Sequence, residues 1–77
     1  MEILKVQKAC YVKDFVIHLQ FNNGFEKDVN LENELWGEVF EPLKDINLFK
    51  KFKLNKWTIE WENGADFAPE FLLKLVN

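Results

Sequence analysis

The sequence lacks several of the residue types on which enzyme active sites depend. It contains no arginine and no serine, and threonine, cysteine and histidine occur once each, as Thr58, Cys10 and His18. These absences remove most nucleophilic and acid–base chemistry. We therefore expect a protein that is not an enzyme and that uses no cofactor and no metal ion.

Cysteine and long apolar segments are also scarce. The single cysteine cannot form an internal disulfide, which fits a reducing compartment. No charged segment followed by an apolar one opens the chain, so secretion is not expected. The apolar run at residues 9–12 is far shorter than the roughly 20 residues of a membrane-spanning helix. We expect a cytoplasmic protein that does not enter the membrane.

Positive charge is in slight deficit. Thirteen acidic residues outnumber ten basic ones, which are all lysine, and the net charge is −3. This argues against a polyanion as the main partner, because cationic side chains supply most nucleic-acid affinity. One cluster keeps nucleic-acid binding as an alternative hypothesis: Lys50, Lys51, Lys53 and Lys56. Because apolar residues are interspersed among these lysines, they fit the solvated face of a strand equally well.

Aromatic residues, in contrast, are abundant. The 77 residues include eight Phe, three Trp and one Tyr. Each such side chain buries on the order of 150 to 250 Å², which helps a short chain to build a core without a metal or a disulfide. Length and composition together predict one domain over residues 1–77.

Alternating apolar residues predict a β-hairpin in the first half of the chain. The first strand has the core-facing set Phe15, Ile17, Leu19 and Phe21. Asn23-Gly24 supplies the positive φ angles of a tight turn, and the returning strand carries Phe25, Lys27 and Val29. Residues 3–8 are predicted to add a third strand, since an isolated hairpin is only marginally stable.

From Asn30 the apolar spacing changes to three and four, which indicates helix. We expect a short helix over residues 31–36, an irregular stretch over 37–42 where Gly37 and Pro42 interrupt it, and a helical turn that Asp45 caps. Leu48 and Phe49 would lie on that turn.

A second hairpin and a last helix complete the prediction. Phe52 and Leu54 alternate on one strand and Trp57, Ile59 and Trp61 on the next, with Asn55-Lys56 between them. The last helix would start at Asp66 or Ala68, with Pro69 in its first turn. Its apolar stripe would be Phe71, Leu72, Leu75 and Val76. The order β-β-β-α-β-β-α predicts an α+β fold, a small antiparallel sheet with helices packed on one face.

Three motifs resemble those of one bacterial family. Residues 61–72, W-E-N-G-A-D-F-A-P-E-F-L, are similar to the W-x-N-G-x-D-x-x-P-E-x-L ending of the domain of unknown function 2442. Residues 21–24 resemble its F-x-[DN]-G turn, and residues 40–49 resemble its F-x-P-L-x-D-x-x-x-F segment. The resemblance spans nearly the whole chain in the expected order.

This resemblance implies a small α+β domain without an established activity and without catalytic residues to transfer. It also implies a neighbouring gene for another small protein, an arrangement suggestive of toxin–antitoxin pairs. Some longer relatives append a helix-turn-helix domain. This chain ends at Asn77 without one, so we do not expect DNA recognition by that route.

The leading hypothesis is therefore a protein–protein interaction module, with an antitoxin-like role in a two-gene pair. Candidate partner-binding residues are Trp36, Phe40, Trp57 and Trp61. Trp36, beside Gly37, is the residue we most expect to be exposed. The row of Trp57, Ile59 and Trp61 fits a core-facing strand better than an exposed platform. A homodimer through a sheet edge, or through an aromatic patch near Trp36 and Phe40, is an alternative.

An enzyme ranks third among the hypotheses. It would rely on His18, or on Asp66 and Glu70 with Asp45 nearby. A half-exposed strand histidine and helix-capping carboxylates explain these residues more simply. Cys10 lacks a neighbouring activating group, and we interpret it as an inert residue at a half-buried strand end.

Overall fold

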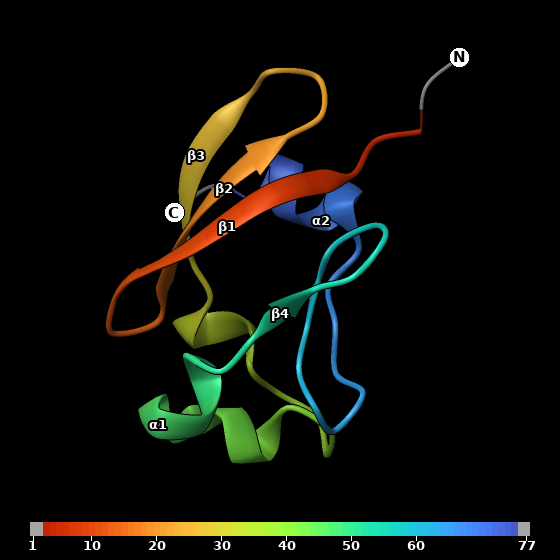
Figure 1. Cartoon of the computed structure of the whole chain (residues 1–77). Coiled ribbons are helices and arrows are strands. Elements are labelled where there is room, and N and C mark those ends of the chain that lie inside the picture. The colour runs from red at the N-terminus through yellow and green to blue at the C-terminus, as the bar shows by residue number, and fades with distance from the viewer. Residues whose placement is uncertain (1–2, 76–77) are drawn as a thin grey trace.

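A three-stranded antiparallel sheet runs through the first part of the chain, in a computed structural model that describes residues 3–75 (Figure 1). Its strands are β1 (Val6–Lys13), β2 (Val16–Phe21) and β3 (Glu26–Asn30), in the order β1-β2-β3. The central strand β2 confirms the predicted alternation for Ile17, Leu19 and Phe21, which are all fully buried, whereas Phe15 precedes the strand and is half-buried. The predicted α+β fold is likewise confirmed.

The strand β1 begins and ends later than the predicted residues 3–8, because it starts at Val6 and continues to an unpredicted turn after Lys13. Asp14 occupies that turn with a φ of 45°. Aspartate tolerates this left-handed conformation better than most residues. The hydroxyl of Tyr11 donates to the carbonyl of Asp14 at 3.0 Å and helps to hold the turn. Cys10 therefore lies within a strand and is exposed, not half-buried at a strand end.

Both Asn-Gly turns form, and they are built in the same way. Gly24 and Gly64 have φ angles of 89° and 90°, and each amide donates to the aromatic residue three positions earlier. The side chain of Asn23 accepts from the amide of Phe25, and that of Asn63 accepts from Ala65. A side chain at Gly24 or Gly64 would meet strain from φ alone, since nothing lies within 4 Å of either position.

The return strand β3 differs in part from the prediction. Val29 is buried as expected, but Phe25 precedes the strand and is exposed. Lys27 is half-buried, and its ammonium group donates to the carbonyls of Leu73 and Leu75. This inward-facing lysine therefore binds the end of the C-terminal helix and does not pack in the apolar core.

Short helical turns connect the two hairpins. They are η1 (Glu32–Glu34), η2 (Glu41–Lys44) and α1 (Ile46–Phe49). The helix predicted over residues 31–36 shrinks to one 3-10 turn, followed by Gly37 with a φ of 95°. Pro42 does not interrupt a helix; it stands in the first turn of η2, where a missing N–H costs nothing. Asp45 caps α1 as predicted, accepting from the amide of Asn47 at 2.9 Å.

The second hairpin forms, but its strands are short. They are β4 (Lys53–Leu54) and β5 (Ile59–Glu60). The side chain of Asn55 accepts from the amides of Trp57 and Thr58, at 2.7 and 2.8 Å, and so curls the chain before β5 begins. Trp57 thus lies in the loop, where its carbonyl accepts from the amide of Val6 and ties this hairpin to β1.

The last helix, α2 (Pro69–Lys74), lies behind the three-stranded sheet (Figure 1). Ala68 is its N-cap; Asp66 instead forms a backbone bridge with Glu60 and does not cap the helix. Leu72 is fully buried against the core, whereas Phe71 is exposed. Val76 lies outside the described residues. No helix within residues 3–75 is both long and apolar enough to cross a membrane.

One cluster of buried residues joins the sheet, the helical turns and the second hairpin. Phe49 lies at its aromatic centre, with ring centroids 5.1 Å from Phe15 and 5.6 Å from Trp61. The cluster consists of Val6, Ile17, Leu19, Phe21, Val29, Leu31, Leu35, Leu43, Phe49, Ile59, Trp61, Ala65, Phe67 and Leu72. The cluster therefore connects β1, β2, β3, η2, α1, β5 and α2.

Candidate functional site

The three tryptophans lie in different environments. Trp36 is 74% exposed in the loop between η1 and Gly37, as the sequence predicts. Trp57 is 47% exposed, so the prediction of a core-facing Trp57 is wrong. Its position in the Asn55 loop, outside β5, explains the difference.

Trp61 is a core residue, only 3% exposed. Its indole N–H donates to the carbonyl of Phe49 at 2.7 Å, which satisfies the polar atom of a buried ring. Phe40 is half-buried and its ring stacks on that of Phe67, with 4.8 Å between the ring centroids. Of the four candidate partner-binding residues, Trp36 and Trp57 are therefore freely accessible, while Phe40 and Trp61 mainly pack inward.

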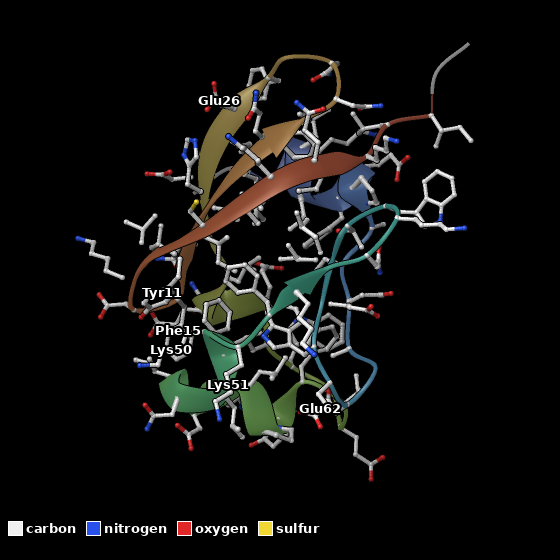
Figure 2. The ribbon with its side chains drawn as sticks, viewed as in Figure 1. Tyr11, Phe15, Glu26, Lys50, Lys51 and Glu62 are labelled. Carbon is white, nitrogen blue, oxygen red and sulfur yellow. The ribbon has the colours of Figure 1, made fainter. Side chains whose placement is uncertain are left out.

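A cleft that the sequence analysis did not anticipate lies beside Trp61. It has a volume of about 290 Å³ and is lined by Pro42, Leu43, Leu48, Lys51, Trp61, Glu62 and Asn63. Its walls come from η2, from α1 and from the turn after β5. Figure 2 labels the two charged residues of the lining, Lys51 and Glu62. The helix α1 is one turn long; it buries Phe49 and leaves Leu48 exposed.

The lysine cluster is solvent-exposed but is not one uniform basic surface. Lys50, Lys51, Lys53 and Lys56 are all exposed. Lys53 stands opposite Glu60 in the β4–β5 pairing, and Lys51 lines the cleft together with Glu62. Acidic side chains therefore interrupt the positive field that a phosphate backbone would require.

His18 lies on the outward face of β2 between two carboxylates of β3. Its Nε2 is 2.9 Å from Glu26 Oε1 and its Nδ1 is 2.7 Å from Asp28 Oδ1. Figure 2 labels Glu26 on this edge of the sheet. These contacts raise the pKa of His18 above its ordinary value of 6.5, with the hydrogen bond to Glu26 as the largest cause and that to Asp28 next. The protonated ring can donate to both carboxylates at once.

This arrangement predicts a measurable pH dependence. Because the folded-state pKa of His18 is raised, its stabilising contribution is fully present below about pH 6.5 and is lost as the pH rises through the folded-state value. An NMR titration of the ring should give a pKa above 6.5, and Glu26→Gln with Asp28→Asn should lower it toward 6.5. An unchanged pKa in the double variant would contradict the two-carboxylate geometry.

The residues considered for catalysis have structural contacts of their own. Cys10 lies opposite His18 in the β1–β2 pairing, but both ring nitrogens already contact carboxylates. Asp45 caps α1 and Asp66 bridges to Glu60. Among residues 3–75, no group of His, Cys, Asp and Glu has a geometry that could hold a metal ion. In the same part of the chain, no buried side-chain polar atom lacks a hydrogen-bond partner.

The three sequence motifs instead have structural roles. The motif at residues 61–72 supplies the buried Trp61, the Asn63-Gly64 turn and the proline that starts α2. The motif at residues 40–49 supplies the Asp45 cap of α1 and Phe49 at the centre of the aromatic cluster. The asparagine at position 22 accepts from the amide of residue 5 and donates to the carbonyl of residue 3, so it holds the segment before β1.

Comparison with known proteins gives one positive result. The family model described as "Protein of unknown function (DUF2442)" matches residues 6–77. No curated protein and no solved structure matches the chain. The match covers all the strands, both α-helices and all three motifs, so the chain belongs to the DUF2442 family of proteins of unknown function.

Proposed function

We propose that this chain is a non-enzymatic protein–protein interaction module, a single domain over residues 1–77 that acts in the cytoplasm. Its partner would be a protein encoded by a neighbouring gene, which it binds in an antitoxin-like manner. The observation that carries the proposal is Trp36, a residue that is 74% exposed and that lies outside the core cluster.

An exposed tryptophan offers a large apolar side chain to a partner. Tryptophan is among the residues most enriched at the energetic centres of protein interfaces. Here the buried tryptophan position is already filled by Trp61, and other aromatic rings complete the core around Phe49. Trp36 therefore supplies a large apolar surface that a partner can bury.

Two further observations support an interface and not a phosphate-binding surface. Trp57 adds a second exposed indole, and it is anchored to β1 through its own carbonyl. Two of the four lysines that would bind nucleic acid lie near acidic residues: Lys53 is opposite Glu60 in the β4–β5 pairing, and Lys51 lines the same cleft as Glu62. Mixed charge of this kind suits the polar rim of a protein interface.

Replacing Trp36 with alanine tests the proposal directly. The protein would be co-expressed with the product of the neighbouring gene, and the complex measured by light scattering and by titration calorimetry. We expect Trp36→Ala to weaken the complex at least about tenfold, as for an interface hot spot. The free energy of unfolding should change by less than about 0.5 kcal/mol, because the side chain is exposed.

Phe25→Ala is the matched control, since this exposed aromatic residue lies in a different turn. It should leave the complex unchanged. A stable homodimer that Trp36→Ala dissociates would identify a second copy as the partner. A monomer that co-purifies with nothing would contradict the proposal. DNA or RNA binding that weakens steeply as salt rises would favour the nucleic-acid alternative instead.

A further inference from the structure

The two Asn-Gly turns contain the sequence in which an asparagine side chain reacts most readily with its own backbone. The amide nitrogen of the glycine can attack the side-chain carbonyl carbon, Cγ, of the asparagine before it and close a ring. Glycine favours this attack because it has no Cβ to crowd the approach. Around both Gly24 and Gly64 the space is open, with nothing within 4 Å of the position that a Cβ would take. Both turns are therefore candidate sites of chemical modification, in keeping with the thermal lability of asparagine.

The side-chain hydrogen bonds of the two asparagines distinguish these turns. Both asparagines are exposed, and the Oδ1 atom of each accepts from the amide two positions later, at 3.0 Å for Asn23 and 3.1 Å for Asn63. Asn63 also donates, since its Nδ2 lies 2.8 Å from the carbonyl oxygen of Val39, which is 24 residues away in the chain. Within residues 3–75 the Asn23 side chain donates no hydrogen bond. Asn63 is thus held at both ends of its amide group and Asn23 at one.

Ring closure requires the asparagine side chain to rotate until Cγ faces the glycine nitrogen, so its hydrogen bonds must break first. For Asn23 only a bond within its own turn must open, and an exposed turn opens locally at little cost in free energy. For Asn63 the bond to Val39 must break as well, and this bond ties the turn after β5 to the segment before η2. An intramolecular hydrogen bond contributes about 1 kcal/mol, which corresponds to roughly fivefold in rate.

We propose that Asn23 is a site of spontaneous modification, at which water converts the side-chain amide to a carboxylate, and that the bond to Val39 protects Asn63. In the first step the Gly24 nitrogen forms a bond to Cγ of Asn23 and the Cγ–Nδ2 bond breaks. The leaving nitrogen takes up the proton of the Gly24 amide and departs as ammonia. Water then adds to a ring carbonyl carbon and the bond from that carbon to the Gly24 nitrogen breaks. Addition at Cγ gives aspartate, and addition at the backbone carbon gives isoaspartate. The inference does not depend on the proposed interaction function.

The two products affect the β2–β3 hairpin differently. Aspartate keeps an oxygen that accepts from the amide of Phe25, so the turn is retained. Isoaspartate routes the backbone through the side chain and adds a carbon atom to the turn. The turn relies on two bonds to Phe21, whose carbonyl accepts from the Gly24 amide at 3.0 Å and whose amide donates to the Phe25 carbonyl at 2.8 Å. A longer turn cannot keep both bonds, so isoaspartate opens this end of the β2–β3 pairing.

Mass spectrometry of the full chain, incubated at mildly alkaline pH and physiological temperature, tests the inference. Conversion of an amide to an acid raises the mass, and peptide mapping locates it and separates aspartate from isoaspartate. In the folded chain we expect Asn23 to convert roughly fivefold faster than Asn63. In concentrated urea both turns are lost, so the two sites should convert at similar rates. Faster conversion of Asn63 in the folded chain, or a rate ratio that urea leaves unchanged, would overturn the inference.

Matched aspartate variants assign the reacting site. Asn23→Asp removes the reactive amide but keeps the acceptor for the Phe25 amide, so it should lack the early mass gain of wild type. Asn63→Asp keeps the acceptor for the Ala65 amide and should show the same early gain as wild type. An early gain that persists in Asn23→Asp would overturn the assignment. Hydrogen exchange on the isolated isoaspartate product should show lost protection at the Phe21 amide, with Asn23→Asp as the protected control. Equal protection in the two would overturn the predicted opening of the hairpin.

Discussion

Replacing Phe49 with alanine is expected to lower the free energy of unfolding by about 3 to 5 kcal/mol, the range for truncating a buried aromatic side chain. Phe49 has no exposed surface and packs against Phe15, Tyr11 and Trp61. Its carbonyl also accepts the indole N–H of Trp61. Loss of the ring would therefore leave a cavity at the point where α1, β1 and the second hairpin meet.

The expected loss is large compared with the total stability. At roughly 0.05 to 0.15 kcal/mol per residue, a chain of 77 residues has about 4 to 12 kcal/mol in all. Urea denaturation followed by circular dichroism would measure the change. Phe49→Leu should cost less than half as much, because it fills part of the volume, and the exposed Phe25→Ala should stay within about 0.5 kcal/mol of wild type. A cost for Phe49→Ala below about 1 kcal/mol would show that the core closes without it.

The second large effect concerns Lys27, whose replacement by methionine should cost about 2 kcal/mol. The ammonium group donates to the carbonyls of Leu73 and Leu75 at the end of α2. Methionine keeps the apolar stem but removes the donor, so both carbonyls lose their charged partner. Hydrogen bonds to charged groups contribute about 1.5 to 3 kcal/mol, and a cation also suits the negative end of the helix dipole.

Hydrogen exchange would show where the Lys27→Met effect acts. The helix α2 has only 6 residues, Pro69–Lys74, and a helix of this length does not persist without tertiary contacts. We expect its amides to lose protection more than those of β2. Lys74→Met, in the last turn but exposed, should change stability by less than about 0.5 kcal/mol. Equal effects of the two substitutions would refute a specific role for Lys27.

The local parts of the fold could be predicted because their signals lie within a few residues. The alternation along β2, the Asn-Gly turns and the Asp45 cap each depend on short-range sterics and hydrogen bonds. The exposure of Trp36 followed from its position beside Gly37. Family membership followed from the same short motifs, which prove to be turns, caps and core positions.

Other features depend on contacts between distant parts of the chain. Lys27 has the inward position of its strand, but its ammonium group finds a partner only in the carbonyl of Leu73, 46 residues later in the chain. The spacing of Trp57 and Ile59 fits one strand face, but the amide of Trp57 donates to the Asn55 side chain. Trp57 therefore lies in the loop before β5. His18 becomes a bridged histidine only because β3 places two carboxylates beside it.

The sequence by itself therefore determined the order of elements, the buried face of the central strand and the scarcity of catalytic side chains, since each follows from residue type and local spacing. Only the tertiary structure decided which tryptophan is buried and which are exposed. It also decided that η2, α1 and the turn after β5 together line a cleft, to which Lys51 and Glu62 contribute. Such a cleft exists only where separate segments meet, and packing against the common core around Phe49 brings them together.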